Sequence, residues 1–201
     1  MILIVKETRY KIDFTFSLTV TFMLILCNRE TVMISIFSSV FHEMGHLFFM
    51  HIFRQKIEQV TFGAFGIRID RHLTTALSYR KEAVIALGGI LVNFIIAIIG
   101  AVHYYIYVDL FSLKLTVVNI IIAIFNMIPL DTLDMGRVLR YTLLYYTDEN
   151  RCDRILYYTS MVFVNLLAGI SIVYSLRVGF NPSLIATSVY LYVITLFKKW
   201  S

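Results

Sequence analysis

Two histidines and a glutamate, His42, Glu43 and His46, stand in the order His-Glu-x-x-His within a long apolar segment. On an α-helix, residues four apart are one turn along and about 40° apart around the axis, so both imidazoles lie on one face. Two imidazoles at this spacing can hold one Zn²⁺ ion, and the adjacent glutamate can act as a base toward water. The motif therefore predicts a zinc site with hydrolytic chemistry, in which His42 and His46 are metal ligands and Glu43 is the general base.

The composition of the chain places this motif in a membrane. Of the 201 residues, 59% are hydrophobic and only 15% are charged, a balance that soluble domains of this length do not show. Apolar stretches approach the roughly 20 residues that span a bilayer and lie at 12–27, 31–53, 83–108, 110–130, 155–176 and 183–197. The sequence predicts an all-α polytopic membrane protein with about six transmembrane helices, of which the helix over 31–53 carries the motif.

An alternative is that the two histidines are only packed in a helix bundle, with a glutamate nearby by chance. Burial in a membrane argues against it. Ionisable groups are costly inside a bilayer, and three of them in five residues indicate a function. Hydrolysis also requires water at that depth. Ser35, Ser38, Ser39 and Asn93 are polar residues in the apolar segments that either line a hydrated cavity or simply allow close helix packing.

The basic residues are divided unequally between the two ends of the apolar segments. Fifteen of the 18 lysines and arginines lie in the N-terminal stretch, in 54–82, in 131–154 and in the C-terminal tail, and three lie at the opposite ends. Basic residues accumulate on the cytoplasmic side of short connections, so we expect both termini in the cytoplasm. The net charge of +5 then matches the anionic headgroups of the lipid bilayer, and no nucleic-acid partner is expected.

The chain contains no internal repeat, low-complexity tract or flexible linker, so residues 1–201 are expected to form a single domain. Lys6, Glu7 and Arg9 follow the first five residues directly, which argues against a cleavable signal peptide. Cys27 and Cys152 fall on opposite sides of the membrane in the expected topology, so no disulfide is expected between them.

A catalytic zinc of this kind has three protein ligands, so one ligand must come from outside the motif. His51 is turned about 140° from His46 on the same helix, which favours an interfacial position. His72 lies in a basic loop and is expected to be solvated. His103 lies near the far end of a span beside tyrosines and is typical of an interfacial anchor.

A better source of the third ligand is the segment 126–137, in which Pro129 interrupts an apolar helix and carboxylates follow. Irregular backbone at membrane depth is tolerated only where it is buried in protein or lines a cavity. Asp131 and Asp134 are both candidates, and they share a face if the segment is helical. Alternatively, Asp134 and Arg137 form an ordinary surface ion pair at i,i+3.

The segment 57–70 alternates apolar and polar residues around two glycines, which predicts a β-hairpin. An amphipathic connector between two spans is the alternative. A hairpin would offer a strand edge to an extended peptide.

With these motifs together, the chain resembles the site-2 protease family of intramembrane zinc metalloproteases. That family pairs His-Glu-x-x-His with a downstream motif of the form Asn-x-x-Pro-x-x-x-Leu-Asp-Gly, which matches 126–137 of this chain. The resemblance implies that Asp134 completes a Zn²⁺ site with His42 and His46, and that Glu43 is the general base. It covers about residues 31 to 140 by motif and the whole chain by layout.

Asn126 and Pro129 fall on the asparagine and proline of the family motif, and Asn126 is expected to orient the substrate or stabilise the oxyanion. The chain departs from the family at Met135, where glycine is common, and at Gly88-Gly89, where a Gly-Pro pair is common. Methionine cannot take the backbone angles open to glycine, which bears on the turn after Asp134.

The resemblance also implies a substrate class and a location. In the family a sheet-like element dips into the membrane near the zinc, so the hairpin at 57–70 is expected to do the same. The small core, without an added module, most resembles the stage IV sporulation protein FB subgroup, whose substrates are sigma-factor precursors. The expected activity is cleavage of a membrane-associated protein near the cytoplasmic face of a bacterial cell membrane, under a membrane-protein inhibitor or regulator. The rivals are a membrane metal transporter or sensor and a catalytically silent scaffold of the same fold.

Overall fold

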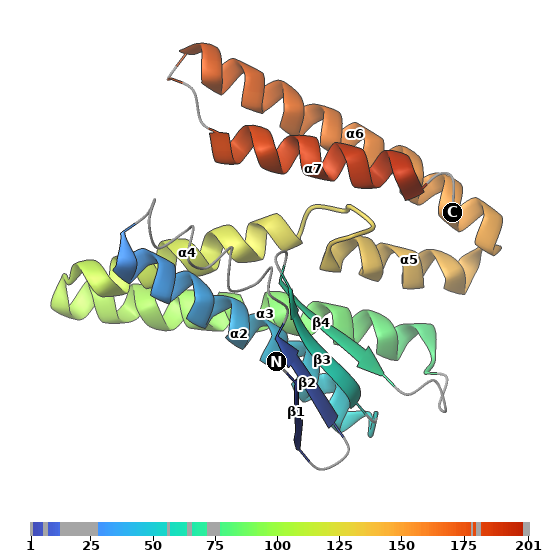
Figure 1. The fold of residues 1–201 in the computed structure, drawn as a ribbon, viewed down its shortest axis with the longest axis horizontal. Coiled ribbons are helices and arrows are strands. Elements are labelled where there is room, and N and C mark those ends of the chain that lie inside the picture. The colour runs from blue at the N-terminus through green and yellow to red at the C-terminus, as the bar shows by residue number, and fades with distance from the viewer. Residues whose placement is uncertain are drawn as a thin grey trace. The chain divides into compact units, whose positions relative to one another are not determined.

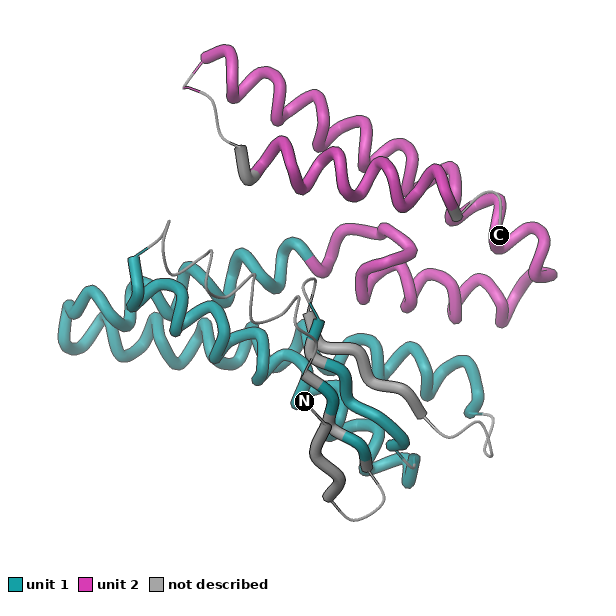
Figure 2. Tube along the Cα trace, in the orientation of Figure 1, with its two compact units in different colours: residues 1–125 teal, residues 126–201 magenta. Residues whose placement is uncertain are grey.

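The computed structural model describes residues 2–5, 8–12, 28–55, 57–63, 66–71, 77–177, 179 and 182–198 (Figure 1). It divides into two compact units, Met1–Phe125 and Asn126–Ser201 (Figure 2). The expected single domain stays a prediction. The apolar segment expected at 12–27 lies, from residue 13 onward, outside the described residues.

The helices of the first unit are α2 (Arg29–Ile52), α3 (Tyr79–Tyr107) and α4 (Leu110–Asn126, whose last residue belongs to the second unit). Asn28 caps α2 by accepting a hydrogen bond from the backbone N–H of Glu30 at 2.9 Å. The helices α2 and α3 approach closely where glycines face each other. A Cβ added to Gly45 would lie 2.3 Å from the carbonyl oxygen of Gly88. Small residues of this kind let transmembrane helices pack backbone to backbone.

A four-stranded sheet also belongs to the first unit, in the order β1 (Ile2–Val5), β2 (Thr8–Ile12), β3 (Ile57–Gly63), β4 (Gly66–Arg71). The predicted hairpin at 57–70 corresponds to β3 and β4, which pair antiparallel. The two N-terminal strands were not predicted. Of these, β2 pairs in parallel with β3, so among the described strands β4 is the free edge of the hairpin (Figure 1).

The second unit contains α5 (Asp134–Tyr146), α6 (Glu149–Arg177) and α7 (Pro182–Lys198) (Figure 2). Within this unit, α6 packs against both α5 and α7. The turn between α4 and α5 holds Pro129, where the sequence predicts an interruption of the helix.

Three of the described helices, α2, α3 and α6, are long and apolar enough to cross a membrane, and α4 and α7 are shorter apolar helices. Large apolar side chains such as Ile98, Ile99 and Leu176 are exposed on these helices. Such surfaces suit lipid rather than water. The prediction of an all-α polytopic membrane protein is confirmed, with the sheet larger than the single hairpin expected.

Candidate metal centre

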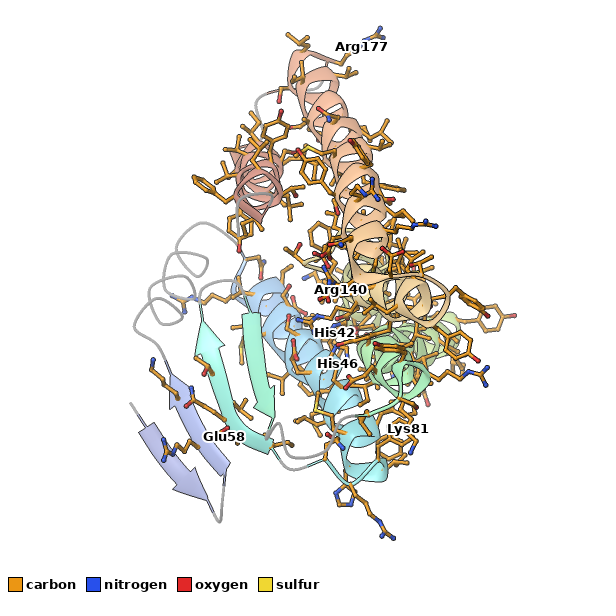
Figure 3. All side chains as sticks on the ribbon, turned by 90° about the vertical axis from the view of Figure 1, so that its right-hand side faces the viewer. His42, His46, Glu58, Lys81, Arg140 and Arg177 are labelled. Atoms are coloured by element: carbon orange, nitrogen blue, oxygen red, sulfur yellow. The ribbon has the colours of Figure 1, made fainter. Side chains whose placement is uncertain are left out.

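The two motif histidines lie on one face of α2, as their spacing predicts (Figure 3). Both are buried, with 6% of His42 and 4% of His46 exposed. Their Nε2 atoms face each other at 3.3 Å. In a tetrahedral zinc site with Zn–N distances of about 2.0–2.1 Å, two ligand nitrogens lie about 3.3–3.4 Å apart. The spacing of the two nitrogens therefore fits a shared metal ion.

The other ring nitrogens of the pair are held by acceptors on α3. His46 Nδ1 lies 2.8 Å from the carbonyl oxygen of Ile85, and His42 Nδ1 lies 2.5 Å from Asn93 Oδ1. An oxygen of this kind only accepts, so each Nδ1 carries a hydrogen, and in a neutral imidazole the lone pair is then on Nε2. A metal ion would accept two such lone pairs at the 3.3 Å spacing of these atoms. Metal-ligating histidines commonly donate their second ring N–H to an oxygen in this way.

Gly89 of α3 leaves the space in front of the two histidines open. A Cβ added at this position would lie 2.6 Å from Nε2 of both His42 and His46. Any larger residue would therefore fill the place where the two lone pairs converge. The glycine and the donor set together fit a bound metal ion.

Behind His42, three fully buried polar side chains form a hydrogen-bond network across α2, α3 and α4. Asn93 Nδ2 donates to Asn119 Oδ1 at 2.8 Å, and Asn119 Nδ2 donates to Ser38 Oγ at 2.9 Å. Buried polar groups in apolar helices are costly unless they are paired, and this network pairs them. Ser38 and Asn93, expected as cavity-lining or packing residues, thus lie in this network, whereas Ser39 is exposed.

Sequence reasoning missed Asn119 in this network and Gly89 over the histidines. The available signal for Asn119 was an amide in the middle of the apolar run of α4, where a buried polar group needs a partner.

Glu43 is half-buried on α2, next to His42 and three residues before His46. On a helix this places its carboxylate on a face adjoining that of the histidines. The arrangement suits a base that acts at the edge of the metal position.

In the second unit, Asp131 forms an ion pair with the side chain of Arg140. Its two carboxylate oxygens accept hydrogen bonds from Arg140 Nε at 3.1 Å and Nη2 at 3.2 Å. Arg140, labelled in Figure 3, also lies 2.9 Å from a carboxylate oxygen of Asp153. The hydrogen bonds to Asp131 raise the pKa of Arg140 above its usual value. Asp131 is therefore committed to an ion pair.

Asp134 is the first residue of α5, whereas Asp131 lies in the turn before that helix. The two carboxylates do not share a helix face. The side chain of Asp134 is buried, and the exposed Arg137 lies 4.0 Å from it, too far for a hydrogen bond. The i,i+3 ion pair with Arg137 is thus present at its distance limit, but the buried carboxylate shows that it is not an ordinary surface pair. Its role as the third ligand stays a prediction, because it lies in the other unit.

The departure at Met135 does not disturb the turn after Asp134. Met135 is within α5, and it is not among the positive-φ residues of the described chain. Glycine is required one position later instead, because a Cβ on Gly136 would lie 1.8 Å from the carbonyl oxygen of Leu130.

The remaining candidates lie apart from the histidine pair or outside the described residues. His51 is exposed near the end of α2. His103 Nδ1, at the far end of α3, lies 3.0 Å from Asp109 Oδ1 and 2.7 Å from Ser112 Oγ. His72 lies outside the described residues. Asn126 is the last residue of α4 and is partly buried, and its role stays a prediction.

Known proteins resemble this chain by structure. No protein-family model and no curated protein matches it. A solved structure, the Site-2 Protease from Methanocaldococcus jannaschii, matches with a TM-score of 0.69 over 97% of this chain and 93% of that chain, at 21% identity. The likeness shows that the two proteins share a fold. Together with the three described helices that are long and apolar enough to cross a membrane, it indicates an integral membrane protein.

Proposed function

We propose that this chain is an intramembrane zinc metalloprotease that cleaves a membrane-associated protein. The observation that carries the proposal is the pair of buried Nε2 atoms of His42 and His46, held 3.3 Å apart, which is the spacing of two nitrogen ligands of one zinc ion. Glu43 lies beside the pair on the same helix. The fold shared with a Site-2 Protease supports the same activity.

The residues that would hold the zinc are His42, His46 and Asp134. A bound Zn²⁺ supplies a Lewis acid that polarises the scissile carbonyl and lowers the pKa of water. Asp134 is favoured over Asp131 as the third ligand by the motif and by its burial, since both oxygens of Asp131 are held by Arg140.

The protein's own residues carry the proton transfers of peptide hydrolysis. The carboxylate of Glu43 accepts a proton from the attacking water and later donates it to the leaving amine nitrogen. Asn126 orients the substrate or donates a hydrogen bond to the developing oxyanion. One water is added across the cleaved bond, and no other reactant is needed.

The edge strand β4 is the proposed site of substrate presentation. A peptide bond within a helix is already hydrogen bonded and sterically shielded, so it must be unwound before cleavage. β2 covers the other side of β3, which leaves β4 as the free edge of the hairpin among the described strands. Pairing of an unwound substrate with this membrane-dipping edge would hold it extended.

The proposed location is a bacterial cell membrane with both termini in the cytoplasm, so that the site opens near the cytoplasmic face. The division of basic residues supports this orientation. The proposed substrate is a sporulation sigma-factor precursor, and the proposed regulator is a membrane-protein inhibitor. Both follow from the resemblance of this small core to the sporulation subgroup.

The test is co-expression of candidate membrane-associated substrates with the wild-type chain or with Glu43→Gln. One cleavage fragment that appears with the wild type and is absent with the variant supports a protease. Metal transport that survives Glu43→Gln, without any fragment, would identify a transporter. A wild-type chain that neither binds zinc nor produces a fragment would be a scaffold.

A further inference from the structure

The side chain of Asn93 determines which nitrogen of His42 carries the hydrogen. Its Oδ1 lies 2.5 Å from His42 Nδ1. The oxygen and nitrogen ends of an amide have nearly the same shape, so a rotation of the amide by half a turn would exchange them. The NH₂ end at this position would require Nδ1 to accept a hydrogen bond. The hydrogen of His42 would then be on Nε2, and Nε2 would no longer be a metal ligand.

The orientation of Asn93 is fixed chiefly by Asn119, a residue of a different helix. Asn93 Nδ2 donates to Asn119 Oδ1 at 2.8 Å, whereas its other acceptor, the backbone carbonyl oxygen of Ser38, lies at the 3.5 Å limit of a hydrogen bond. Asn119 is also an amide, so its own orientation must be fixed by another group. Its Nδ2 lies 2.8 Å from the backbone carbonyl oxygen of Leu115, one turn earlier on α4. A backbone carbonyl can only accept, so this end of Asn119 is the NH₂ end.

The donations therefore all run in one direction, from His42 through Asn93 and Asn119 to the backbone carbonyl of Leu115 on α4. The Leu115 carbonyl fixes Asn119, Asn119 fixes Asn93, and Asn93 fixes the hydrogen of His42 on Nδ1. Asn93 and Asn119 have 0% of their surface exposed. Bulk water therefore does not reach either amide.

We propose that Asn119 is a positioning residue that keeps His42 in its metal-binding tautomer by fixing the orientation of Asn93. This inference rests on the proposed zinc site and adds a residue on α4 that is not itself a proposed ligand. His46 does not depend on it, because the backbone carbonyl of Ile85 holds its Nδ1 directly. One ligand of the pair is therefore fixed by the backbone and the other by a chain of side chains.

The first variant is Asn119→Leu, which replaces the amide by an apolar side chain and leaves Asn93 Nδ2 only its 3.5 Å contact with the Ser38 carbonyl oxygen. The readout is zinc affinity of the detergent-purified full chain, measured by competition with a chromophoric chelator. We expect a loss of about 10–100-fold, as is typical when a residue behind a metal ligand is removed. The visible absorption of the Co²⁺-loaded protein should lose its tetrahedral intensity in parallel.

The matched control is Ser112→Ala. Ser112 is also buried on α4, seven residues from Asn119 and on the same face, but its hydroxyl contacts His103 and not the network. Its zinc affinity should equal that of the wild type. Equal losses in Asn119→Leu and Ser112→Ala would mean that any buried polar change on α4 weakens the site, which would overturn the inference.

A double variant separates the effect of Asn119 on the orientation of Asn93 from its effect on helix packing. In Asn93→Asp both side-chain oxygens accept, so His42 Nδ1 keeps its hydrogen in either orientation. Asn93→Asp combined with Asn119→Leu should therefore bind zinc at least about 10-fold more tightly than Asn119→Leu alone, by the same scale of effect. A double variant as weak as the single one would contradict the proposal.

Asn119→Ala is a second, smaller substitution if leucine prevents folding, and the same loss and the same recovery by Asn93→Asp are expected. Unchanged zinc affinity in folded Asn119→Leu or Asn119→Ala overturns the role of Asn119 while leaving the protease proposal intact. A wild-type chain that binds no zinc overturns the proposed function itself. The two failures are thus distinguishable.

Discussion

Arg140 holds Asp131 through both carboxylate oxygens, at 3.1 and 3.2 Å. The pair lies within the second unit, and the backbone N–H of Asp131 also donates to Ser160 Oγ at 3.3 Å. Asp131 thus joins the turn before α5 to α5 and α6. Its neighbour in the motif, Asp134, is the carboxylate that we propose as the metal ligand.

Asp134→Ala should lower the affinity for zinc strongly. Asp131→Ala should leave the affinity for zinc nearly unchanged. Loss of a residue behind a ligand costs about 10–100-fold in metal affinity, and loss of a ligand costs more. Asp131→Ala should instead lower the free energy of unfolding by about 1–3 kcal/mol, because it removes a charge-assisted acceptor from Arg140. Chelator competition and thermal unfolding measure the two effects. The reverse order of zinc affinities would move the third ligand to Asp131.

Gly89→Ala should weaken zinc binding by more than about 10-fold, because the new methyl group would lie 2.6 Å from Nε2 of both histidines. Gly169→Ala is the matched control, since a Cβ at Gly169, also on a transmembrane helix, meets nothing within 4 Å. That variant should bind zinc as the wild type does. Normal zinc affinity in folded Gly89→Ala would show that the metal position is not in front of Gly89.

Much of the fold follows from local patterns in the sequence. Apolar runs of membrane length predict the helices, and the spacing of His42 and His46 places both on one face of α2. The sheet is different, because β2 pairs in parallel with β3 across about 50 residues of chain, and such non-local pairing leaves no local pattern. The predicted hairpin was therefore found, and the strands beside it were not.

The metal centre shows the same division. The motif identifies His42, Glu43 and His46 from the sequence alone. It does not show that Asn119 lies behind His42, because an asparagine in an apolar helix can equally bond to its own backbone. Only the packing of α3 against α2 and α4 brings Asn93 between the two residues.

The membrane topology is testable with single cysteines in a background lacking Cys27 and Cys152. Ser78, before α3, and Leu110, at the start of α4, are exposed. Ser112 on the same turn is buried and is unsuited to labelling. In intact cells an impermeant thiol reagent should label Leu110→Cys and not Ser78→Cys, because basic residues flank Ser78. Labelling of Ser78→Cys alone would reverse the orientation and exclude a cytoplasmic sigma-factor precursor as substrate.

Glu43→Gln should lower the rate of proteolysis by about 10²–10⁴-fold, because the amide keeps the shape of glutamate but does not accept a proton. Zinc affinity should change little, since Glu43 is not a proposed ligand. The rate is measured on a reconstituted substrate with equal amounts of zinc-loaded wild type and variant. Cleavage by the variant at the wild-type rate would rule out Glu43 as the general base.

The zinc content of the purified chain tests the metal centre most directly. Elemental analysis after equilibration with Zn²⁺ and removal of free metal should give one zinc per wild-type chain. His42→Ala and His46→Ala should each give far less than one, because either change breaks the facing pair of Nε2 atoms. A folded wild-type chain without zinc, or a histidine variant that keeps a full equivalent, would contradict a zinc centre on α2.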